Sequence, residues 1–302
     1  MILAVFALAL LIDISPHKPD WFKTQSIYVE LPSIDYELYT EDENGNELDT
    51  LTYSPIVSSF YGIAVDTKWA GFALSIQNPE SEYELFEESK LFDLQFFGVF
   101  KKFEWELYYQ KYEGLYISQE EEVPVGSRPA ANARSFGFEL RYFLKDEFNP
   151  KASFGSSQPE KQTNGSWILG LYGNRQTLKA NTGLIPTEFE SNFDQLAGLR
   201  EFETSSLGVD AGYGGMYLGD WYYLTGFFTL GFQLQEQAFK GIDQEDRIVS
   251  GASNNLHLEF GYPFKNGAAG LRAKSSNLEI PIKNAKFSQS RNQVRIFYKH
   301  YY

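Results

Sequence analysis

Cysteine is absent from the 302 residues of this sequence. Without cysteine the chain forms no disulfide bond, no thiolate metal site and no lipid-anchored cysteine of the lipoprotein type. Long apolar runs are also missing, because no internal stretch reaches the length of about 18 residues that a membrane-spanning helix requires. These absences exclude a disulfide-stabilised domain and a helical membrane protein.

Positive charge is scarce, with 26 Lys and Arg side chains against 40 Asp and Glu and a formal net charge of −14. Binding to the phosphates of a nucleic acid requires clustered Lys and Arg, so no nucleic acid is expected as a partner. The motifs of P-loop, dinucleotide and H-E-x-x-H zinc sites are missing, as is the G-x-S-x-G motif of hydrolases. We therefore predict no cofactor, no metal site and no enzymatic activity.

Aromatic residues are abundant, since 20 Tyr and 26 Phe contribute most of an aromatic content of 17%. Tyr and Trp are enriched where a membrane protein crosses the boundary between lipid and water. The mean hydropathy of −0.35 is typical of a soluble protein. It is also compatible with a membrane β-barrel, in which only alternate residues of each strand face lipid.

The N-terminus carries an apolar run from Ile2 to Ile12, which has the length of a signal-peptide core and is too short to cross a membrane as a helix. No Lys or Arg precedes this run, and a buried helix or strand is the alternative interpretation. We predict a signal peptide or leader over residues 1–20. Residues 21–50 are then an N-terminal periplasmic segment with the first strand, within residues 36–53, and residues 51–302 form a barrel.

A β-hairpin is predicted from Leu91 to Tyr112, where apolar and polar residues alternate on both sides of a break at Lys101 and Lys102. Side chains change face at every residue of a strand, so this alternation gives each strand one apolar and one polar face. Glu104 and Glu106 share the polar face of the second strand. A soluble sheet would expose these carboxylates to water, whereas a membrane barrel would direct them into a wet lumen.

The same alternation recurs as far as the C-terminus, and the connections between the expected strands differ in length. Short turns near Lys68, Lys101, Gly219 and Asn266 alternate with longer, often acidic connections. These longer connections are residues 78–90, 113–134, 175–204, 235–253 and 277–290. Short turns on the periplasmic side and long extracellular loops are typical of outer-membrane barrels. We therefore predict an all-β, antiparallel transmembrane β-barrel of about twelve strands, with ten as the alternative.

One segment departs from this rule, because residues 145–165 form a long connection on the side where the turns should be short. We predict that it folds into the periplasmic mouth of the barrel and restricts the lumen.

The C-terminal strand predicts a partner in barrel assembly. The final residue, Tyr302, is aromatic, and Val294, Ile296 and Tyr298 alternate before it, a pattern that resembles the signal recognised by barrel-assembly machinery.

The acidic loop segments around residues 80–88 and 120–122 have carboxylates that suit Ca²⁺ or Mg²⁺, ions that bridge lipopolysaccharide phosphates. Solvated loops without bound cations are the alternative. Outer-membrane lipids and lipopolysaccharide are the other expected partners.

The predicted lumen carries a network of charged side chains, with acids mostly on the early and middle strands and bases mostly on the last two. Its members are Asp93, Glu104, Glu106, Glu139, Arg141, Asp210, His257, Glu259, Arg272, Lys274 and Arg295. Asp66 and Lys299 have the same predicted orientation. Such residues can form a paired network that fills a narrow barrel, line a pore or ligand site, or contribute to catalysis through His257 and Glu259.

Three stretches resemble an uncharacterised bacterial family, the domain of unknown function 4421. They are LTYSPIVSSFYGIAVDTKWAGFALSI (51–76), LFDLQFFGVFKKFEWELYYQKYEGLYI (91–117) and FNPKASFGSSQPEKQTNGSWILG (148–170). The family's Pro-Asn step is Pro55–Ile56 here, and its arginine is missing near Ser153–Phe154. The resemblance implies an envelope or outer-membrane location and no particular activity.

We therefore expect an outer-membrane protein of a Gram-negative bacterium with a polar, largely plugged lumen. Its role is structural, or it binds or passes a small solute without catalysis. One alternative is a membrane-embedded enzyme that modifies lipid or lipopolysaccharide through His257 and Glu259. Another is a soluble periplasmic β-barrel that binds an apolar ligand.

Overall fold

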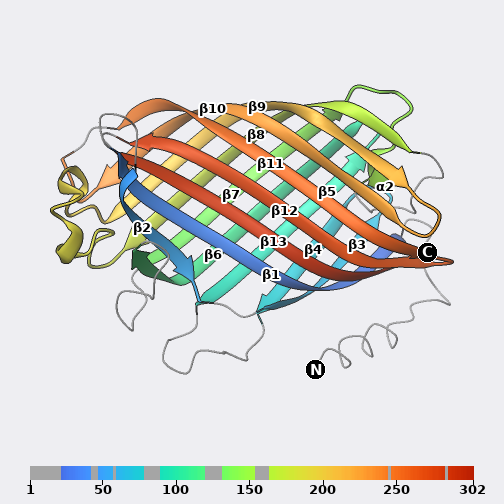
Figure 1. Ribbon diagram of the computed structural model, residues 1–302, viewed down its shortest axis with the longest axis horizontal. Helices are drawn as coiled ribbons and strands as arrows, with labels where there is room; N and C mark the ends of the chain where they lie inside the picture. The colour runs from blue at the N-terminus through green and yellow to red at the C-terminus, as the bar shows by residue number, and fades with distance from the viewer. Residues whose placement is uncertain are drawn as a thin grey trace.

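Antiparallel strands form a closed wall in the computed structural model of this protein (Figure 1). The structure describes residues 22–41, 47–56, 59–77, 89–119, 131–153, 163–243, 246–282 and 285–302. The strands are β1 (Phe22–Glu41), β2 (Glu47–Pro55), β3 (Phe60–Thr67), β4 (Gly71–Gln77), β5 (Lys90–Phe100), β6 (Phe103–Gln119), β7 (Ala131–Phe143), β8 (Asn164–Ala180), β9 (Glu201–Leu218), β10 (Tyr223–Lys240), β11 (Arg247–Phe264), β12 (Gly267–Ile282) and β13 (Ala285–Tyr301). Short helices α2 (Pro150–Ser153), η1 (Thr187–Phe189) and η2 (Asp194–Leu196) lie in connections.

The first and last strands close the barrel. β1 pairs with β13 from Thr24 opposite Tyr301 to Thr40 opposite Ala285. We call the end of the barrel where β1 begins and β13 stops the terminal end, and the opposite end the loop end. Among the described residues, no helix has the length and apolar character needed to cross a membrane.

The wall contains twelve strands at the terminal end and ten at the loop end. β2 and β3 are two parts of one interrupted strand, and both run antiparallel to β1. Near the terminal end β3 continues the wall through β4 and β5 to β6. Near the loop end β2 pairs directly with β6, so the described parts of β4 and β5 do not reach the ring there. The predicted count of twelve is confirmed, and the alternative count of ten describes the narrower end.

Ser89 links β2 and β6 by hydrogen bonds at the point where the pairing of strands in the wall changes. Its side chain is fully buried, and its hydroxyl donates a hydrogen bond to the carbonyl of Gly114 on β6 (2.5 Å). The same oxygen accepts a hydrogen bond from the backbone N–H of Ile56, which follows β2 (2.9 Å). Gly114 lies in a β-bulge with a φ of 85°, a left-handed conformation that favours glycine. On β1, Pro32 lies between the segments that pair with β2 and β3, where its missing N–H is tolerated.

The outer face carries a continuous apolar belt. On β10 the outward side chains from Leu224 to Leu234 are exposed and apolar, and Glu236 follows them. This belt measures about 33 Å along the strand, or about 25 Å along the barrel axis at a tilt of about 40°. Exposed Trp69, Trp167 and Trp221 lie close to the terminal end, as expected for residues at a lipid–water boundary. The wall is therefore a transmembrane barrel, which argues against the soluble alternative.

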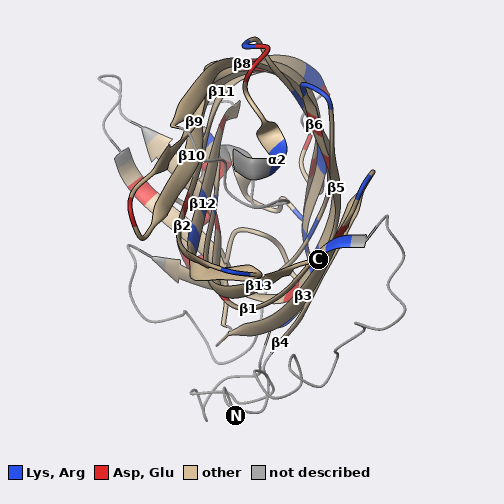
Figure 2. Ribbon diagram, turned by 90° about the vertical axis from the view of Figure 1, so that its right-hand side faces the viewer, with Lys and Arg blue, Asp and Glu red and all other residues tan. Residues whose placement is uncertain are grey.

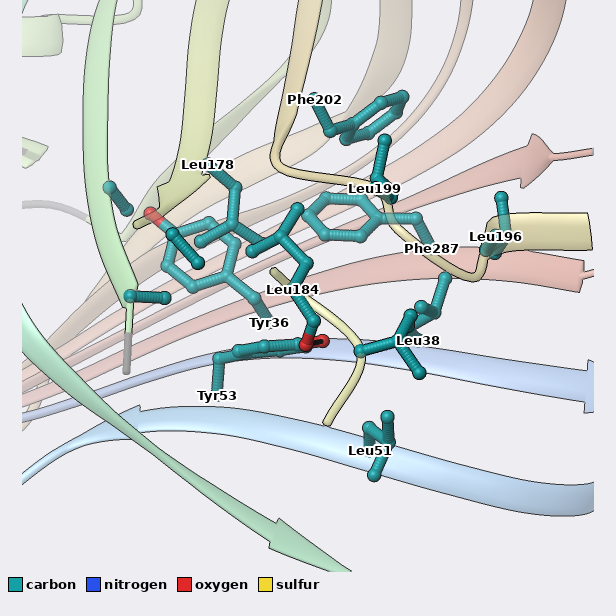
Figure 3. Close-up of a cluster of buried hydrophobic side chains, with 14 of the residues drawn as sticks. Tyr36, Leu38, Leu51, Tyr53, Leu178, Leu184, Leu196, Leu199, Phe202 and Phe287 are labelled. Atoms are coloured by element: carbon teal, nitrogen blue, oxygen red, sulfur yellow. Dashed lines mark hydrogen bonds between the residues drawn. The ribbon is translucent and has the colours of Figure 1, made fainter. Parts of the chain in front are cut away.

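An apolar cluster closes the lumen at the loop end, and we call it the cap. The connection between β8 and β9, which contains η1 and η2, turns inward and buries its apolar side chains against the inner wall (Figure 3). The hydroxyl of Tyr53 on β2 donates a hydrogen bond to the carbonyl of Leu184 in this connection (2.6 Å). The buried side chains contributed by the connection are Leu184, Ile185, Phe193, Leu196 and Leu199. Their partners on the wall include Ile34, Tyr36, Leu38, Leu51, Phe202, Phe239 and Phe287.

A smaller aromatic cluster narrows the terminal end. Phe148, in the connection between β7 and β8, stacks on Phe143 with ring centroids 5.0 Å apart. Both rings are buried with Ile168 and Phe227, which belong to the inner wall. Figure 2 shows α2, in the same connection, inside the outline of the ring. The described part of this connection, residues 144–153, thus lies in the mouth as predicted, and residues 154–162 lie outside the described residues.

The structure differs from the sequence prediction at the N-terminus and in the loops. β1 occupies residues 22–41 and pairs with β13, so these described residues of the expected periplasmic segment belong to the wall, which therefore begins before residue 51. The expected leader, residues 1–20, lies outside the described residues. The long loop expected over residues 277–290 is wrong, because β12 and β13 leave only two residues between them. The middle parts of these strands, residues 274–277 and 288–293, carry polar residues on both faces, which weakens the alternation, and at the loop end the apolar residues face inward into the cap.

The junction at Ser89 gives a testable prediction. Replacing Ser89 with Ala removes the buried hydroxyl that pairs with the partly buried backbone N–H of Ile56 and carbonyl of Gly114. We expect the free energy of unfolding to fall by about 1–3 kcal/mol, measured by urea titration in detergent micelles. The exposed Ser250 on β11 is the control, and Ser250→Ala should change stability by less than about 0.5 kcal/mol. Equal effects of the two substitutions on the free energy of unfolding would show that the hydrogen bonds of Ser89 do not stabilise the wall.

Candidate functional site

Polar and charged side chains fill the lumen between the cap and the aromatic cluster. They come from the inner face of the strands, where alternation places every second residue. All eleven residues predicted for the lumen network lie on this face. The structure divides them into separate groups, each with its own partners, instead of one continuous network.

Arg141 on β7 is the centre of the first group. Its guanidinium donates a hydrogen bond to Glu104 on β6 (3.1 Å) and forms a second ion pair with Glu139 on its own strand. The guanidinium also lies over the ring of Phe227 on β10, 4.5 Å from the ring centroid. Asp210, a buried carboxylate on β9, accepts a hydrogen bond from the hydroxyl of Thr229 (3.1 Å). Buried charges need such partners, so this group is stable only as a unit.

Glu259 on β11 is the centre of the second group. Its carboxylate is fully buried and is held by two cations, Arg272 on β12 (2.5 Å) and Lys299 on β13 (2.5 Å). The phenol of Tyr223 on β10 donates a further hydrogen bond to it (2.8 Å). Both carboxylate oxygens are therefore engaged by neighbouring strands, and Glu259 is bound as a structural counter-ion.

Several ion pairs link acids of the early strands with bases of the late strands. Arg295 on β13 pairs with Glu30 on β1 across the seam that closes the barrel. Arg291 reaches Asp93 on β5 (3.4 Å). Lys274 on β12 reaches Glu106 on β6 (3.5 Å). The partners of the last two pairs lie far apart around the ring, so these two pairs cross the lumen.

The pair His257 and Glu259, considered above for catalysis, does not form a free acid–base site. His257 is buried with its ring edge-on to Phe227, at a centroid distance of 5.4 Å. Glu259 is the carboxylate already held by Arg272, Lys299 and Tyr223. A general base must be able to reach the proton that it takes from a substrate, and a carboxylate engaged in this way is not available for that task.

Described residues line two cavities inside the polar region. The larger, of about 100 Å³, extends from the Arg141 group toward the cap and includes Gln233, Gln289 and Gln293 in its lining. The smaller, of about 60 Å³, lies toward the terminal end beside Asp66 and Lys299. Four side chains line both cavities and lie between them, namely Glu104, Glu106, His257 and Lys274. The ion pairs thus form a constriction, and the larger cavity lies between it and the cap.

The inner wall is crowded because small residues lie beneath large ones. A Cβ atom at Gly62 on β3 would come within 2.0 Å of the Tyr28 ring on β1. The small residues that the sequence places on one face of these strands therefore make room for inward-pointing aromatic rings.

Several inner residues of this region were not predicted from the sequence. Glu30 was assigned to a periplasmic segment, and Arg291 was adjacent to an expected loop. Gln176, Gln235 and Gln289 fell within segments expected to be loops. The inward alternation continues through all of these positions, and it was the only signal that could have placed them.

The described residues contain no group of three or more His, Cys, Asp or Glu side chains arranged to hold a metal ion. The acidic segments proposed for Ca²⁺ or Mg²⁺, residues 80–88 and 120–122, lie outside the described residues. Their cation binding therefore stays a prediction.

Comparison with known proteins identifies a family and no activity. The family model described as Domain of unknown function (DUF4421) matches residues 24–300. No curated protein matches the chain. Solved structures similar to it include the outer membrane protease OmpT from Escherichia coli (10% identity, 96% of this chain and 99% of that one covered, TM-score 0.42). The outer-membrane OmpT of Vibrio cholerae (10%, 95% and 99%, 0.31) and the toluene transporter TodX of Pseudomonas putida (11%, 94% and 90%, 0.29) are also similar.

The two cations around Glu259 give a testable prediction. Glu259→Gln leaves Lys299 and Arg272 buried without their common carboxylate, and we expect a loss of about 3–5 kcal/mol in unfolding free energy. Glu113→Gln removes an ion pair with Lys111 in which both side chains are exposed, and its effect should be within about 1 kcal/mol. Urea titration in micelles measures both. A small loss for Glu259→Gln would mean that water or another acid neutralises the two cations.

Proposed function

We propose, from the premise that this chain belongs to the DUF4421 family, that it is an outer-membrane barrel of a Gram-negative bacterium that binds a small solute inside a closed lumen. The observation that carries this proposal is the larger cavity, which is polar and lies between the cap and the ion-pair constriction. An open diffusion pore would instead leave a continuous aqueous channel.

The outer membrane is supported by the surface of the barrel. Its apolar belt has the height of an outer-membrane barrel, and exposed Trp side chains lie at one boundary of the belt. The strand ends at the loop end carry charged outward residues such as Glu236 and Lys240, which suit a lipopolysaccharide-rich surface. We also propose that barrel-assembly machinery recognises β13, whose outward side chains Val294, Ile296 and Tyr298 belong to the belt.

Entry from the loop end is supported by the position of the larger cavity. Leu278, which belongs to the cap, also lines this cavity, so the cap lies directly between the cavity and the loop end. The cap side chains contributed by the β8–β9 connection are held mainly by apolar packing. On the opposite side, a solute would have to pass the ion pairs of Arg141, Glu104, Glu106 and Lys274. Opening the cap breaks no buried ion pair, and this difference supports entry from the loop end.

The alternative of a lipid- or lipopolysaccharide-modifying enzyme has less support. It requires His257 and Glu259 to act together on a substrate, and the Glu259 carboxylate is already held by two cations and a phenol.

Membrane location is tested by fractionation. We expect the protein in the outer-membrane fraction of native envelopes, and we expect unboiled samples to migrate differently from boiled samples on a gel. A closed barrel remains folded in detergent until it is heated, which changes its mobility. Recovery from the soluble periplasm without such a shift would contradict the proposed location.

Closure of the lumen is tested with single cysteines, because the natural chain contains none. Ser253 and Ser250 both lie on β11, the first in the cavity lining and the second exposed on the outer face. We expect a small charged thiol reagent to label Ser250→Cys rapidly and Ser253→Cys slowly. Adding Leu196→Ser, which weakens the cap, should accelerate labelling at residue 253 alone.

Two results would contradict this proposal. Equally rapid labelling of residues 250 and 253 in the presence of the natural cap would indicate an open pore. Acceleration by Phe148→Ala, combined with no effect of Leu196→Ser, would place the entry at the terminal end.

A further inference from the structure

The larger cavity is lined by amide groups whose hydrogen-bonding capacity is unused. Gln233 on β10 is about 1% exposed, and neither its amide nitrogen nor its amide oxygen has a hydrogen-bond partner among the described residues. The oxygens of Gln293 and Asn174 in the same lining also lack a partner there. A buried polar group without a partner costs about 1–3 kcal/mol, so the cavity requires an occupant that both donates and accepts hydrogen bonds.

The charges around this cavity are balanced. The lining contains three carboxylates, Glu104, Glu106 and Glu139, and three cations, Arg141, Lys274 and Arg291. Each of them already forms an ion pair with another side chain of the lumen. An additional charge on a bound solute would lose its hydration and find no free counter-ion, and this cost excludes a charged occupant.

Aromatic rings complete the lining. Tyr108 and Tyr172 face the same space, and their hydroxyls are engaged with Asn174 (3.0 Å) and Ser253 (2.7 Å), respectively. The rings thus offer apolar contact surface next to unused amide groups. Sugars and polyols present this combination, because their C–H faces are apolar while each hydroxyl both donates and accepts hydrogen bonds.

We propose that the chamber around Gln233 binds an uncharged, polyhydroxylated solute, namely a small sugar or polyol. This inference rests on the proposed solute-binding function and specifies its chemical class. The cavity of about 100 Å³ exceeds the space of about 10–15 Å³ that one water molecule needs, so the competing occupant is a group of several waters.

The test compares three probes of nearly equal size and different charge. D-glucose is neutral, D-gluconate is an anion and D-glucosamine is a cation at neutral pH. The purified full-length barrel in micelles is titrated with each probe, and the thermal unfolding midpoint and the heat of binding are measured. We expect saturable binding of glucose with an affinity at least about tenfold above that of either charged analogue, a preference of the size that one unfavourable buried interaction produces.

A pair of glutamine variants locates the site. Gln233→Leu removes the two unpartnered amide groups, and we expect it to abolish glucose binding without lowering the stability of the unliganded barrel. Gln237 is the matched control, because it is buried on the same face of β10 and lies outside the cavity lining. Its amide is already engaged with Pro281 (3.2 Å) and Arg247 (2.9 Å). Gln237→Leu should therefore lower stability and leave glucose affinity unchanged.

The binding results distinguish the solute-binding function from the neutral class of the solute. The absence of saturable binding for all three probes, both in the natural chain and in the Leu196→Ser variant with its weakened cap, would contradict the solute-binding function and this inference together. Tighter binding of gluconate or glucosamine would retain the function and overturn the neutral class. Glucose binding that survives Gln233→Leu would show that the solute lies elsewhere, and water alone would then occupy this chamber.

Discussion

Backbone hydrogen bonding is the constraint on which the rest of this structure depends. In a lipid environment no water is available to pair an exposed N–H or C=O group, so the sheet must close on itself. β1 satisfies this requirement on one side by pairing with β13 from Thr24 to Thr40. On its other side β1 pairs in turn with β3 and β2, and the wall changes there from twelve strands to ten. The buried hydroxyl of Ser89 pairs with backbone groups on both sides of this change.

The narrow lumen is the consequence of this closure. Charged side chains that point inward lose most of their hydration, so they are stable only in pairs. The barrel solves this problem across the ring, with Arg291 on Asp93 and Lys274 on Glu106, and across the closing seam, with Arg295 on Glu30. The paired charges leave the larger cavity without free charge, and the neutral glutamine amides are the groups on which the proposed selection of an occupant depends.

The two ends of the lumen are closed by different means, and this difference gives the barrel a direction. At the loop end, the connection between β8 and β9 buries a set of apolar side chains. Within this connection the backbone N–H of Leu184 donates a hydrogen bond to the carbonyl of Leu199 (2.6 Å). At the terminal end, Phe148 stacks on Phe143 beside a constriction made of ion pairs. Opening the cap breaks no buried ion pair, whereas opening the constriction does. This difference supports the proposed entry through the loop end and the proposed role as a binding chamber instead of a diffusion channel.

The sequence by itself determined the antiparallel sheet, the hairpin around Lys101 and the inward orientation of residues such as Glu104, Arg141 and Glu259. These features depend on alternation between adjacent residues, which is visible in the sequence wherever lipid is on one side of the wall. Alternation fades where strands extend beyond the belt, so Gln289 was assigned to a loop. Glu30 lies within the belt, opposite Arg295, and was assigned to a separate segment although Val29 and Leu31 flank it. Only the tertiary structure decided which charges meet, since Arg291 and Asp93 are 198 positions apart and their contact depends on the curvature of the closed ring. The change from twelve to ten strands and the insertion of the cap also depend on that closure, because they are set by contacts between strands that are distant in the chain.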